Sequence, residues 1–204
     1  QKLFLAAALI ILLLAVTGGM IRFRQQPSEI LTINSACEAY RQDVETIAAE
    51  YGMSDYTDLI LALMMQESSG QGTDPMQSSE GAYNTRYPQQ PNGITDPSYS
   101  ISCGIQELKY ALDKAGCTGP TDLSKIRLAL QAYNFGADSY FAYLEENGQT
   151  VWTAQSAQAF AQMASGGTQR DEDDPLHDPA GPWDYGDQYS PDHVLRYYHL
   201  DNNS

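Results

Sequence analysis

Apolar residues recur at helical intervals along most of this 204-residue chain, and no stretch shows the strict alternation of a surface strand. Beyond residue 34, seven segments carry the helical pattern, and most begin at a capping residue or end at a glycine. We expect helices over residues 35–51, 54–68, 96–115, 122–134, 137–147, 153–165 and 191–198. The pattern predicts an all-α domain of about seven helices without internal repeats.

The N-terminal stretch differs because it is apolar on all sides. Residues 3–21 carry no charge, with Lys2 before them and Arg22 and Arg24 after them, and this length is enough to cross a bilayer core. A cleaved signal peptide is the alternative, because the strongest apolar run covers only residues 3–16. No A-x-A cleavage pattern follows, so we expect one transmembrane helix within residues 1–24, a linker over 25–34 and a domain over 35–204.

The basic residues around this predicted anchor leave its orientation open. Arg22 and Arg24 outnumber Lys2, which by the positive-inside rule would put the domain on the cytoplasmic side. The sequence starts with glutamine rather than methionine, however, and basic residues further upstream would change that balance.

The net charge of −15 argues against nucleic acid and against anionic membrane surfaces as partners. Part of this charge comes from the acidic run at residues 171–174, which is typical of a solvated loop.

The cysteines Cys37, Cys103 and Cys117 form no C-x-x-C pair and have no metal-ligand spacing. A domain outside the membrane allows one disulfide and one free thiol. A helix through Cys103 would hold it about 20 Å from Cys117, so we expect a pair that includes Cys37. The histidines lie in no recognisable motif, so we expect neither a metal site nor a nucleophile at Cys103.

One apolar run ends at a carboxylate. Glu67 shares a helical stripe with Leu59 and Leu63, and Gly70 and Gly72 are expected to end the helix there. Burial and the negative end of the helix dipole both raise the pKa of a carboxyl group, and a protonated glutamate at neutral pH suits general acid catalysis. Most glutamates at helix ends are simply solvated, so position alone does not assign this role.

The segment that follows, residues 70–95, has no periodicity and contains several glycines and prolines. A loop of this length inside a compact domain is usually functional, and a disordered insertion is the alternative. We favour a binding loop because the polar sequence DPMQSSEGAYN fills Asp74–Asn84.

Three short stretches follow one another along the chain: QESSG at Gln66–Gly70, CGIQ at Cys103–Gln106, and AYNFG at Ala132–Gly136. In order and spacing they resemble the lysozyme-like superfamily of soluble lytic transglycosylases and goose-type lysozymes. The closer resemblance is to bacterial lysozyme domains of cell-wall hydrolases, many of them encoded with conjugation systems. It rests on DPMQSSE, on the PSYSI–GIQ segment at residues 97–106 and on the ending YGDQYSPDHVLRYY, and it covers residues 35–198.

The resemblance implies a role for each matching residue. Glu67 matches the general acid that protonates the glycosidic oxygen between N-acetylmuramic acid and N-acetylglucosamine. Tyr133 and Asn134 match residues that line the cleft beside this acid, and Gln106 matches a helix residue that faces the same cleft. Their hydrogen bonds and flat rings suit neutral amido sugars.

The same resemblance places sugar contacts in the polar loop, from Gln77, Ser78, Ser79 and Glu80. Hydrolysis also needs a second group that activates water or stabilises the transition state. The candidates are Glu80, which we prefer because its loop would fold over the cleft, and Asp74 and Asp96. Asp74 precedes proline and suits a turn, and Asp96 suits a helix N-cap.

Three activities stay open at this point. A muramidase is the first expectation, from the family's lysozyme-like members. A lytic transglycosylase, in which the sugar's own hydroxyl attacks, fits if no second carboxylate faces Glu67. A module that only binds glycan or docks in a secretion apparatus is the third, and the intact E-S-S-G stretch argues against it.

The resemblance and the predicted anchor also suggest where the chain acts. We expect a single-pass protein of the cell membrane, with its catalytic domain on the extracytoplasmic, cell-wall side. The expected partners are peptidoglycan glycan strands and components of a conjugation or secretion apparatus. We expect no cofactor.

Overall fold

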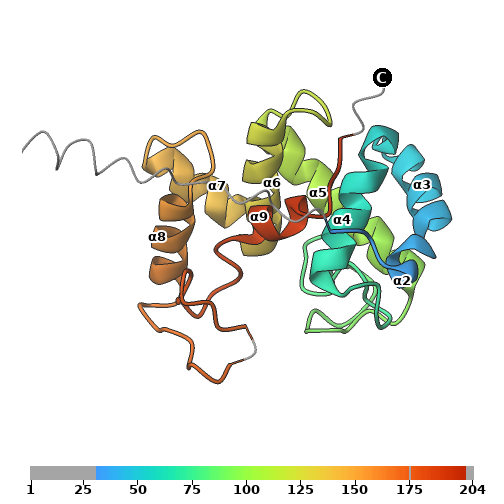
Figure 1. Ribbon diagram of the computed structural model, residues 1–204. Coiled ribbons are helices and arrows are strands. Elements are labelled where there is room, and N and C mark those ends of the chain that lie inside the picture. The colour runs from blue at the N-terminus through green and yellow to red at the C-terminus, as the bar shows by residue number, and fades with distance from the viewer. Residues whose placement is uncertain (1–30, 175, 201–204) are drawn as a thin grey trace, which may run out of the picture.

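The computed structural model describes residues 31–174 and 176–200, whose regular secondary structure is helical apart from an isolated bridge between Gln169 and Trp183. The helices, labelled as in Figure 1, are α2 (Ser35–Glu38), α3 (Arg41–Glu50), α4 (Thr57–Glu67), α5 (Pro97–Ala115), α6 (Leu123–Phe135), α7 (Ala137–Glu146), α8 (Ala154–Ala164) and α9 (Ser190–Leu195), with a 3-10 turn at Ser54–Tyr56. The all-α prediction is confirmed.

The predicted transmembrane helix within residues 1–24 lies outside the described residues, as does most of the predicted linker. Within the described ranges, every helix is too short or too polar to cross a membrane.

The first predicted helix, 35–51, is two helices in the structure. α2 ends at Glu38 and α3 begins at Arg41, because the backbone N–H of Tyr40 bonds to the carbonyl of Cys37 and tightens the turn between them. The apolar period runs through the break, since Cys37, Val44 and Ala48 are all buried and keep helical spacing across it. A break that leaves the period intact gives no signal in the sequence.

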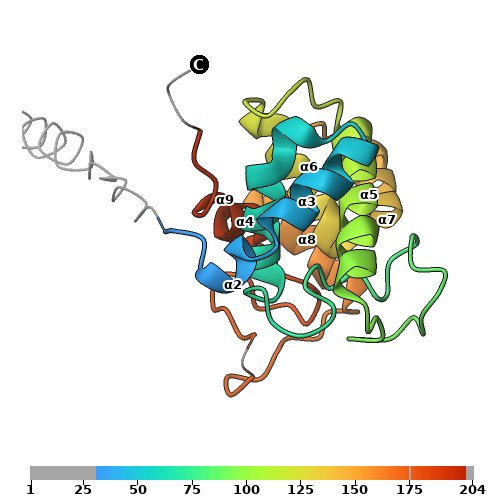
Figure 2. The same cartoon turned by 90° about the vertical axis from the view of Figure 1, so that its right-hand side faces the viewer.

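Helix α4 runs through the middle of the core. Its residues from Leu59 to Met64 are all fully buried, so the helix is enclosed on every side rather than along one stripe. It packs between α3 and α9, an arrangement that Figure 2 shows. The carboxylate at its end is therefore carried on a tightly held element.

The chain turns away directly after Glu67. Ser69 and Gly70 take left-handed backbone angles, with φ of 55° and 74°. A Cβ on Gly70 would lie 2.7 Å from the backbone nitrogen of Cys37, so only glycine fits against α2. Asn34 accepts the N–H of Cys37 and donates its amide to the carbonyl of Ser69 at 3.0 Å. The start of α2 thereby fixes the turn after α4.

The two ends of the described chain also meet. The N–H of Leu31 donates to the carbonyl of Arg196 at 3.2 Å, and the ring of His199 bonds to the carbonyl of Leu31 at 2.8 Å. The segment that enters the domain is thus bound both to the turn after α4 and to the end of α9.

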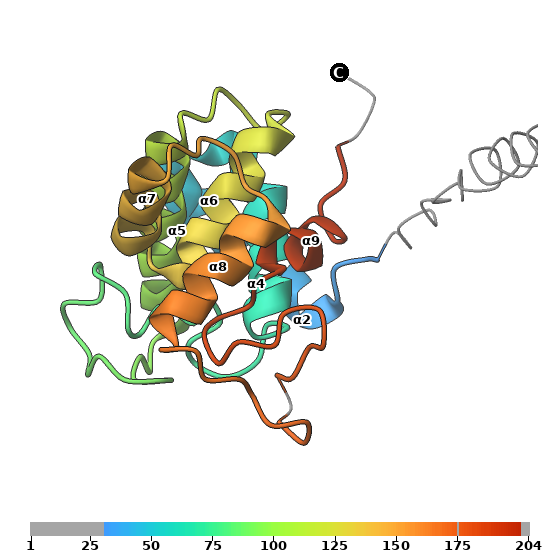
Figure 3. The same ribbon diagram turned by 90° about the vertical axis from the view of Figure 1, so that its left-hand side faces the viewer.

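Two long segments, residues 68–96 and 165–189, extend from the same end of the helical assembly (Figures 1 and 3). The C-terminal end of α4 lies between them. The second segment is held by its aromatic ring Tyr185, which packs 5.6 Å from Phe135 and 5.8 Å from Phe160 between ring centroids. Together these loops border Glu67.

The predicted disulfide is wrong, because all three cysteines are free thiols. Cys37 lies 3.8 Å from the sulfur of Met65, Cys103 donates to the carbonyl of Tyr83, and Cys117 donates to the carbonyl of Gly119. Each thiol fills a place in a helical core, as free cysteine often does.

Candidate active site

Glu67 borders two hollows in the surface. The first, which we call the tyrosine hollow, has a volume of about 600 Å³, and its lining includes Gln77, Glu80, Tyr83, Glu107, Tyr110, Tyr133, Asn134 and Tyr185. The second, the histidine hollow, has a volume of about 680 Å³, and its lining includes Gln66, Gln77, Asn134, Arg170, His177, Asp178, Asp187, His193 and Arg196. Because Glu67, Gln77 and Asn134 border both, the hollows form one groove with Glu67 at its middle.

The carboxyl group of Glu67 is poorly placed to carry a charge. Burial raises its pKa to about 8, and the negative charges of Asp187, Asp74 and Glu107 act in the same direction. Among the described residues, no side chain or backbone group donates a hydrogen bond to it. At neutral pH the group therefore holds a proton that it can give to a ligand in the groove.

Tyr133 and Asn134 lie in the groove at the end of α6, as the sequence motif predicts. The Tyr133 hydroxyl donates to the carbonyl of Met76 at 2.8 Å, which ties the first long loop to α6. The Asn134 side chain accepts the N–H of Asp187 at 2.7 Å, which ties the second loop to the same helix end. The motif thus positions both walls of the groove around Glu67.

Gln77 borders both hollows and is exposed. Its φ angle is 48°, which is uncommon for a residue with a side chain. The side-chain amide donates to the carbonyl of Asp74 and to Asn92 Oδ1, each at 3.0 Å. Backbone strain at a groove residue is typical of functional positions.

Asp74, Ser78 and Ser79 lie beneath this loop rather than in the groove. All three are 1% exposed. The carboxylate of Asp74 accepts the N–H groups of Ser78 and Ser79 at 3.1 Å each and the hydroxyl groups of Ser79 and Ser100. These side chains have their partners inside the protein, so they shape the loop and offer nothing to a ligand.

Gln106 also lies elsewhere. Its amide donates to the carbonyl of Ser102 at 3.1 Å, and it lines a third hollow between α3, α5 and the loop, which shares Ala82 and Tyr83 with the tyrosine hollow but not Glu67. Asp96 lines that same hollow and accepts the N–H groups of Ser98 and Tyr99, so it is the N-cap of α5. Neither residue borders the groove at Glu67.

The place expected for Gln106 is taken by the next residue, Glu107, which the sequence analysis missed. Glu107 lines the tyrosine hollow, and burial raises its pKa to about 7. Its Oε1 is buried without a hydrogen-bond partner among the described residues. Gly104 packs against Met76, and Glu107 follows one helical turn later on the same face of α5, so this packing, rather than the sequence motif alone, locates it.

Glu80 is the loop carboxylate that reaches the groove. It is exposed and lines the tyrosine hollow together with Glu67 and Glu107. Together with Asp138 of α7, four carboxyl groups from α4, α5, α7 and the intervening loop line this hollow.

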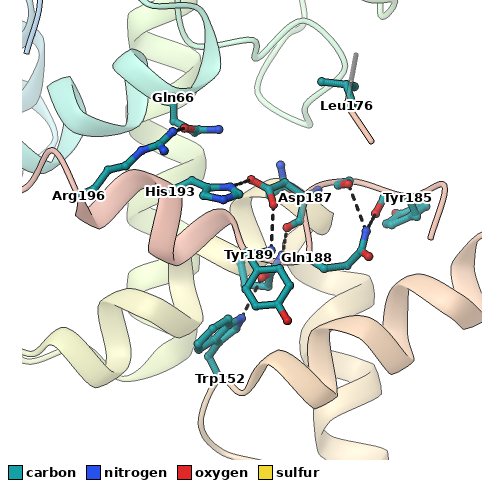
Figure 4. A network of polar contacts seen from close by, with 12 residues as sticks. Gln66, Trp152, Leu176, Tyr185, Asp187, Gln188, Tyr189, His193 and Arg196 are labelled. Atoms are coloured by element: carbon teal, nitrogen blue, oxygen red, sulfur yellow. Dashed lines mark hydrogen bonds and ion pairs between the residues drawn. The ribbon is translucent and has the colours of Figure 1, made fainter. Parts of the chain in front are cut away.

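A charged pair in the histidine hollow was also missed. His193 Nδ1 lies 2.6 Å from Asp187 Oδ2, and this hydrogen bond raises the pKa of His193 (Figure 4). Asp187 also accepts the N–H of Tyr189 at 2.9 Å. Both residues belong to the YGDQYSPDHVLRYY stretch, which carried the family resemblance without any assigned role.

Within the described ranges, no group of histidine, cysteine, aspartate and glutamate side chains could hold a metal ion.

Comparisons with known proteins show the family of the chain. A family model described as lysozyme-like matches residues 35–190. The bifunctional muramidase/DL-endopeptidase CwlT of Bacillus subtilis (strain 168) is 35% identical over 169 residues, which are 83% of this chain and 44% of CwlT. The uncharacterized membrane protein YocA of the same organism is 35% identical over 147 residues, 72% of this chain and 60% of YocA.

Among solved structures, the fold resembles a protein of Staphylococcus aureus subsp. aureus Mu50 described as similar to lipoprotein, NLP/P60 family. The TM-score is 0.69 at 28% identity, covering 85% of this chain and 56% of that one. The chain thus spans about half the length of the relatives that it matches.

Proposed function

The chain belongs to the lysozyme-like family, and we propose that it hydrolyses the β-1,4 bond between N-acetylmuramic acid and N-acetylglucosamine in peptidoglycan. The observation that carries this proposal is the place of Glu67. Its carboxyl group, with a pKa raised to about 8, lies where the tyrosine hollow and the histidine hollow meet.

Glu67 is the general acid in this proposal. Breaking a glycosidic bond at neutral pH requires a proton on the leaving oxygen, and a group whose pKa lies near the working pH delivers it best. Burial supplies that pKa, and the enclosed helix α4 holds the carboxyl group in place. The similarity to CwlT, which is named as a muramidase over part of its length, supports the same chemistry.

The rest of the tyrosine hollow suits neutral sugars. Tyr83, Tyr110 and Tyr185 bring phenol rings to its walls, and Gln77 and Asn134 bring amides. Such side chains stack on pyranose rings and hydrogen-bond to hydroxyl and acetamido groups without requiring a charge on the ligand.

Glu80 and Glu107 are the candidates for the second carboxyl group in this proposal. Both line the tyrosine hollow with Glu67, whereas Asp74 is occupied inside the loop. Their presence favours hydrolysis over the transglycosylase route, which needs only one acid/base group.

We place the protein at the cell membrane with this domain facing the cell wall. The apolar stretch at residues 3–21 supports an anchor, and the substrate lies outside the membrane. Components of a conjugation or secretion apparatus stay a prediction from the family resemblance.

The test is to incubate the purified protein with peptidoglycan and to separate the products by mass spectrometry. New reducing ends on muramic acid support the proposal, anhydromuramyl ends identify a lytic transglycosylase, and the absence of products identifies a binding module. A Glu146→Gln variant is the matched control, because Glu146 ends α7 as Glu67 ends α4 but is exposed and lines neither hollow.

A further inference from the structure

The histidine hollow has a different chemistry from the rest of the groove. The whole chain carries 26 acidic residues against 11 lysines and arginines, yet this hollow contains two arginines and two of the three histidines. These basic side chains are Arg170, His177, His193 and Arg196. Basic groups gathered beside the candidate catalytic acid of an acidic protein require an explanation.

Arg196 is the basic group with most capacity left for a ligand. Its Nη2 donates to the side-chain carbonyl of Gln66 at 3.1 Å, next to Glu67 in sequence (Figure 4). Its Nε is buried without a hydrogen-bond partner in the described part of the chain. No carboxylate among the described residues pairs with it, whereas Arg41 and Arg127 each form ion pairs at the surface. A guanidinium group has five N–H donors, so most of them stay free for a ligand.

Arg170, His193 and Asp178 each have a partner within the protein, and Asp178 keeps its negative charge. His193 pairs with Asp187, and Arg170 lies 3.4 Å from Asp184, with its side chain only 9% exposed. Asp178 accepts the N–H of Ala180. His177 has a buried Nδ1 without a hydrogen-bond partner in the same ranges. Arg196 is therefore the cation without a carboxylate partner, His177 has a ring nitrogen without one, and both can donate to an anion.

We propose that the histidine hollow is a subsite for a carboxylate carried by the muramoyl residue of the substrate, with Arg196 as its main contact. This proposal rests on the proposed function and specifies its substrate. The two sugars of peptidoglycan differ in the lactyl ether of muramic acid, which ends in a free carboxyl group or in a stem peptide with carboxylates of its own. A planar, forked guanidinium group binds such a carboxylate with two parallel hydrogen bonds.

The position of the hollow supports this assignment. It shares Glu67, Gln77 and Asn134 with the tyrosine hollow, so a sugar bound beside the bond under attack has its substituents within this second hollow. The tyrosine hollow supplies phenol rings, amides and carboxyl groups, whereas the histidine hollow supplies a cation without a carboxylate partner among the described residues. A groove built in this way would distinguish muramoyl from glucosaminyl residues by charge.

The experiment compares three substrates with the full-length protein. These are glycan strands with stem peptides, strands freed of peptides that expose the lactyl carboxylate, and the same freed strands after conversion of that carboxylate to a neutral amide. We expect Arg196→Gln to lower kcat/KM at least tenfold, mainly through KM, on one or both of the charged substrates. The effect on the neutral strands should be under twofold. The charged substrate that shows the loss identifies the source of the carboxylate.

Arg196→Lys should recover part of the loss, because it keeps the charge but not the fork. Arg127→Gln is the matched control, since Arg127 pairs with Asp192 at the surface outside the hollow. An equal loss on all three substrates, or no loss on any, would overturn the proposal.

A binding measurement separates this proposal from the proposed function. In the Glu67→Gln background, N-acetylmuramic acid should bind more tightly than N-acetylglucosamine by NMR titration, and Arg196→Gln should remove the difference. Equal binding of both sugars would overturn the subsite even if the protein cleaves peptidoglycan. A preference for N-acetylmuramic acid would support the subsite even if no cleavage is found.

Discussion

Glu67 and Asp74 are two carboxylates seven residues apart in one continuous segment, and the fold treats them in opposite ways. Asp74 is 1% exposed and accepts hydrogen bonds from two backbone N–H groups and from serine hydroxyls. Glu67 borders open space on two sides and receives no hydrogen bond from any described residue. Asp74 has its hydrogen-bond partners within the protein, whereas Glu67 has none among the described residues.

The difference shows that the polar residues of one loop have two separate roles, in holding the loop together and in facing the groove. The stretch from Asp74 to Asn84 has the composition of a ligand-binding loop, but its buried members Asp74, Ser79 and Asn84 bond to one another and to the loop backbone. Only Gln77 and the residues from Glu80 to Tyr83 reach the groove. Buried polar side chains make the loop rigid, and that rigidity positions the few side chains that face a ligand.

The largest expected effect comes from Glu67→Gln. Removing the general acid should lower the rate of glycan cleavage by about a thousandfold. The helical content, measured by circular dichroism, should be unchanged. A variant that keeps more than a tenth of the activity would exclude Glu67 as the acid.

The same variant should change stability in a pH-dependent way. The pKa of Glu67 is raised in the folded chain from its ordinary value of 4.5 to about 8, so its contribution to stability is present below pH 4.5 and lost as the pH rises through 8. Glu67→Gln should therefore leave Tm unchanged near pH 4 and raise it near pH 8. We expect about 1 to 2 kcal/mol, less than the full shift implies, because the residue is only partly buried. Differential scanning calorimetry at the two pH values tests this.

Asp74→Ala should act mainly on stability, and on activity only as a consequence. It leaves the donors of Ser78, Ser79 and Ser100 without their buried acceptor, which should cost about 3 kcal/mol of folding free energy. Activity should fall as well, because the loop that carries Gln77 and Glu80 loses its anchor. Urea unfolding gives the free energy. A loss of activity with unchanged stability would place Asp74 in the chemistry rather than in the loop.

Asp187→Asn should produce a smaller effect, confined to the pH profile. Asp187 is the carboxylate that raises the pKa of Glu67 most, so removing its charge should lower that pKa. The acid would then lose its proton at a lower pH, and the alkaline limb of the rate profile should move down by about half a pH unit. A profile that stays in place or moves up would mean that the two groups do not interact.

The smallest effect is expected from Gln106→Ala. Gln106 lies in the third hollow, between α3, α5 and the first long loop, and its amide donates a hydrogen bond to the carbonyl of Ser102 in its own helix. Cleavage rates should change by less than about threefold, as for a surface substitution. A loss above tenfold would show that the hollow lined by Gln106 also takes part in substrate binding.

The parts of this picture that the sequence predicted are those set by local pattern. Helical periods and caps located α5 to α8 to within one or two residues, and Asp96 caps α5 as its position before Pro97 indicates. Of the residues that the three motifs assigned to one cleft, Glu67, Tyr133 and Asn134 line the tyrosine hollow, whereas Gln106 does not.

The parts that the sequence did not predict depend on contacts between distant segments. Gln106 and Glu107 are neighbours on one helix, and only the packing of Gly104 on Met76 decides which of them faces Glu67. Arg196 meets Gln66 across 130 positions of sequence, a contact that no local pattern reports. The prediction of a disulfide was wrong because sequence spacing does not indicate which thiols the core encloses.

The bonds of Asn34 and Leu31 have a mechanical consequence. Asn34 holds the turn directly after Glu67, and Leu31 holds the backbone of Arg196, so the entering chain is attached to the walls of the groove at two points. A force applied to the chain before residue 31 would be transmitted to these walls before it reached the rest of the domain. Any attachment at that end, whether a natural tether or a surface linkage made in the laboratory, would therefore load the groove around Glu67 directly.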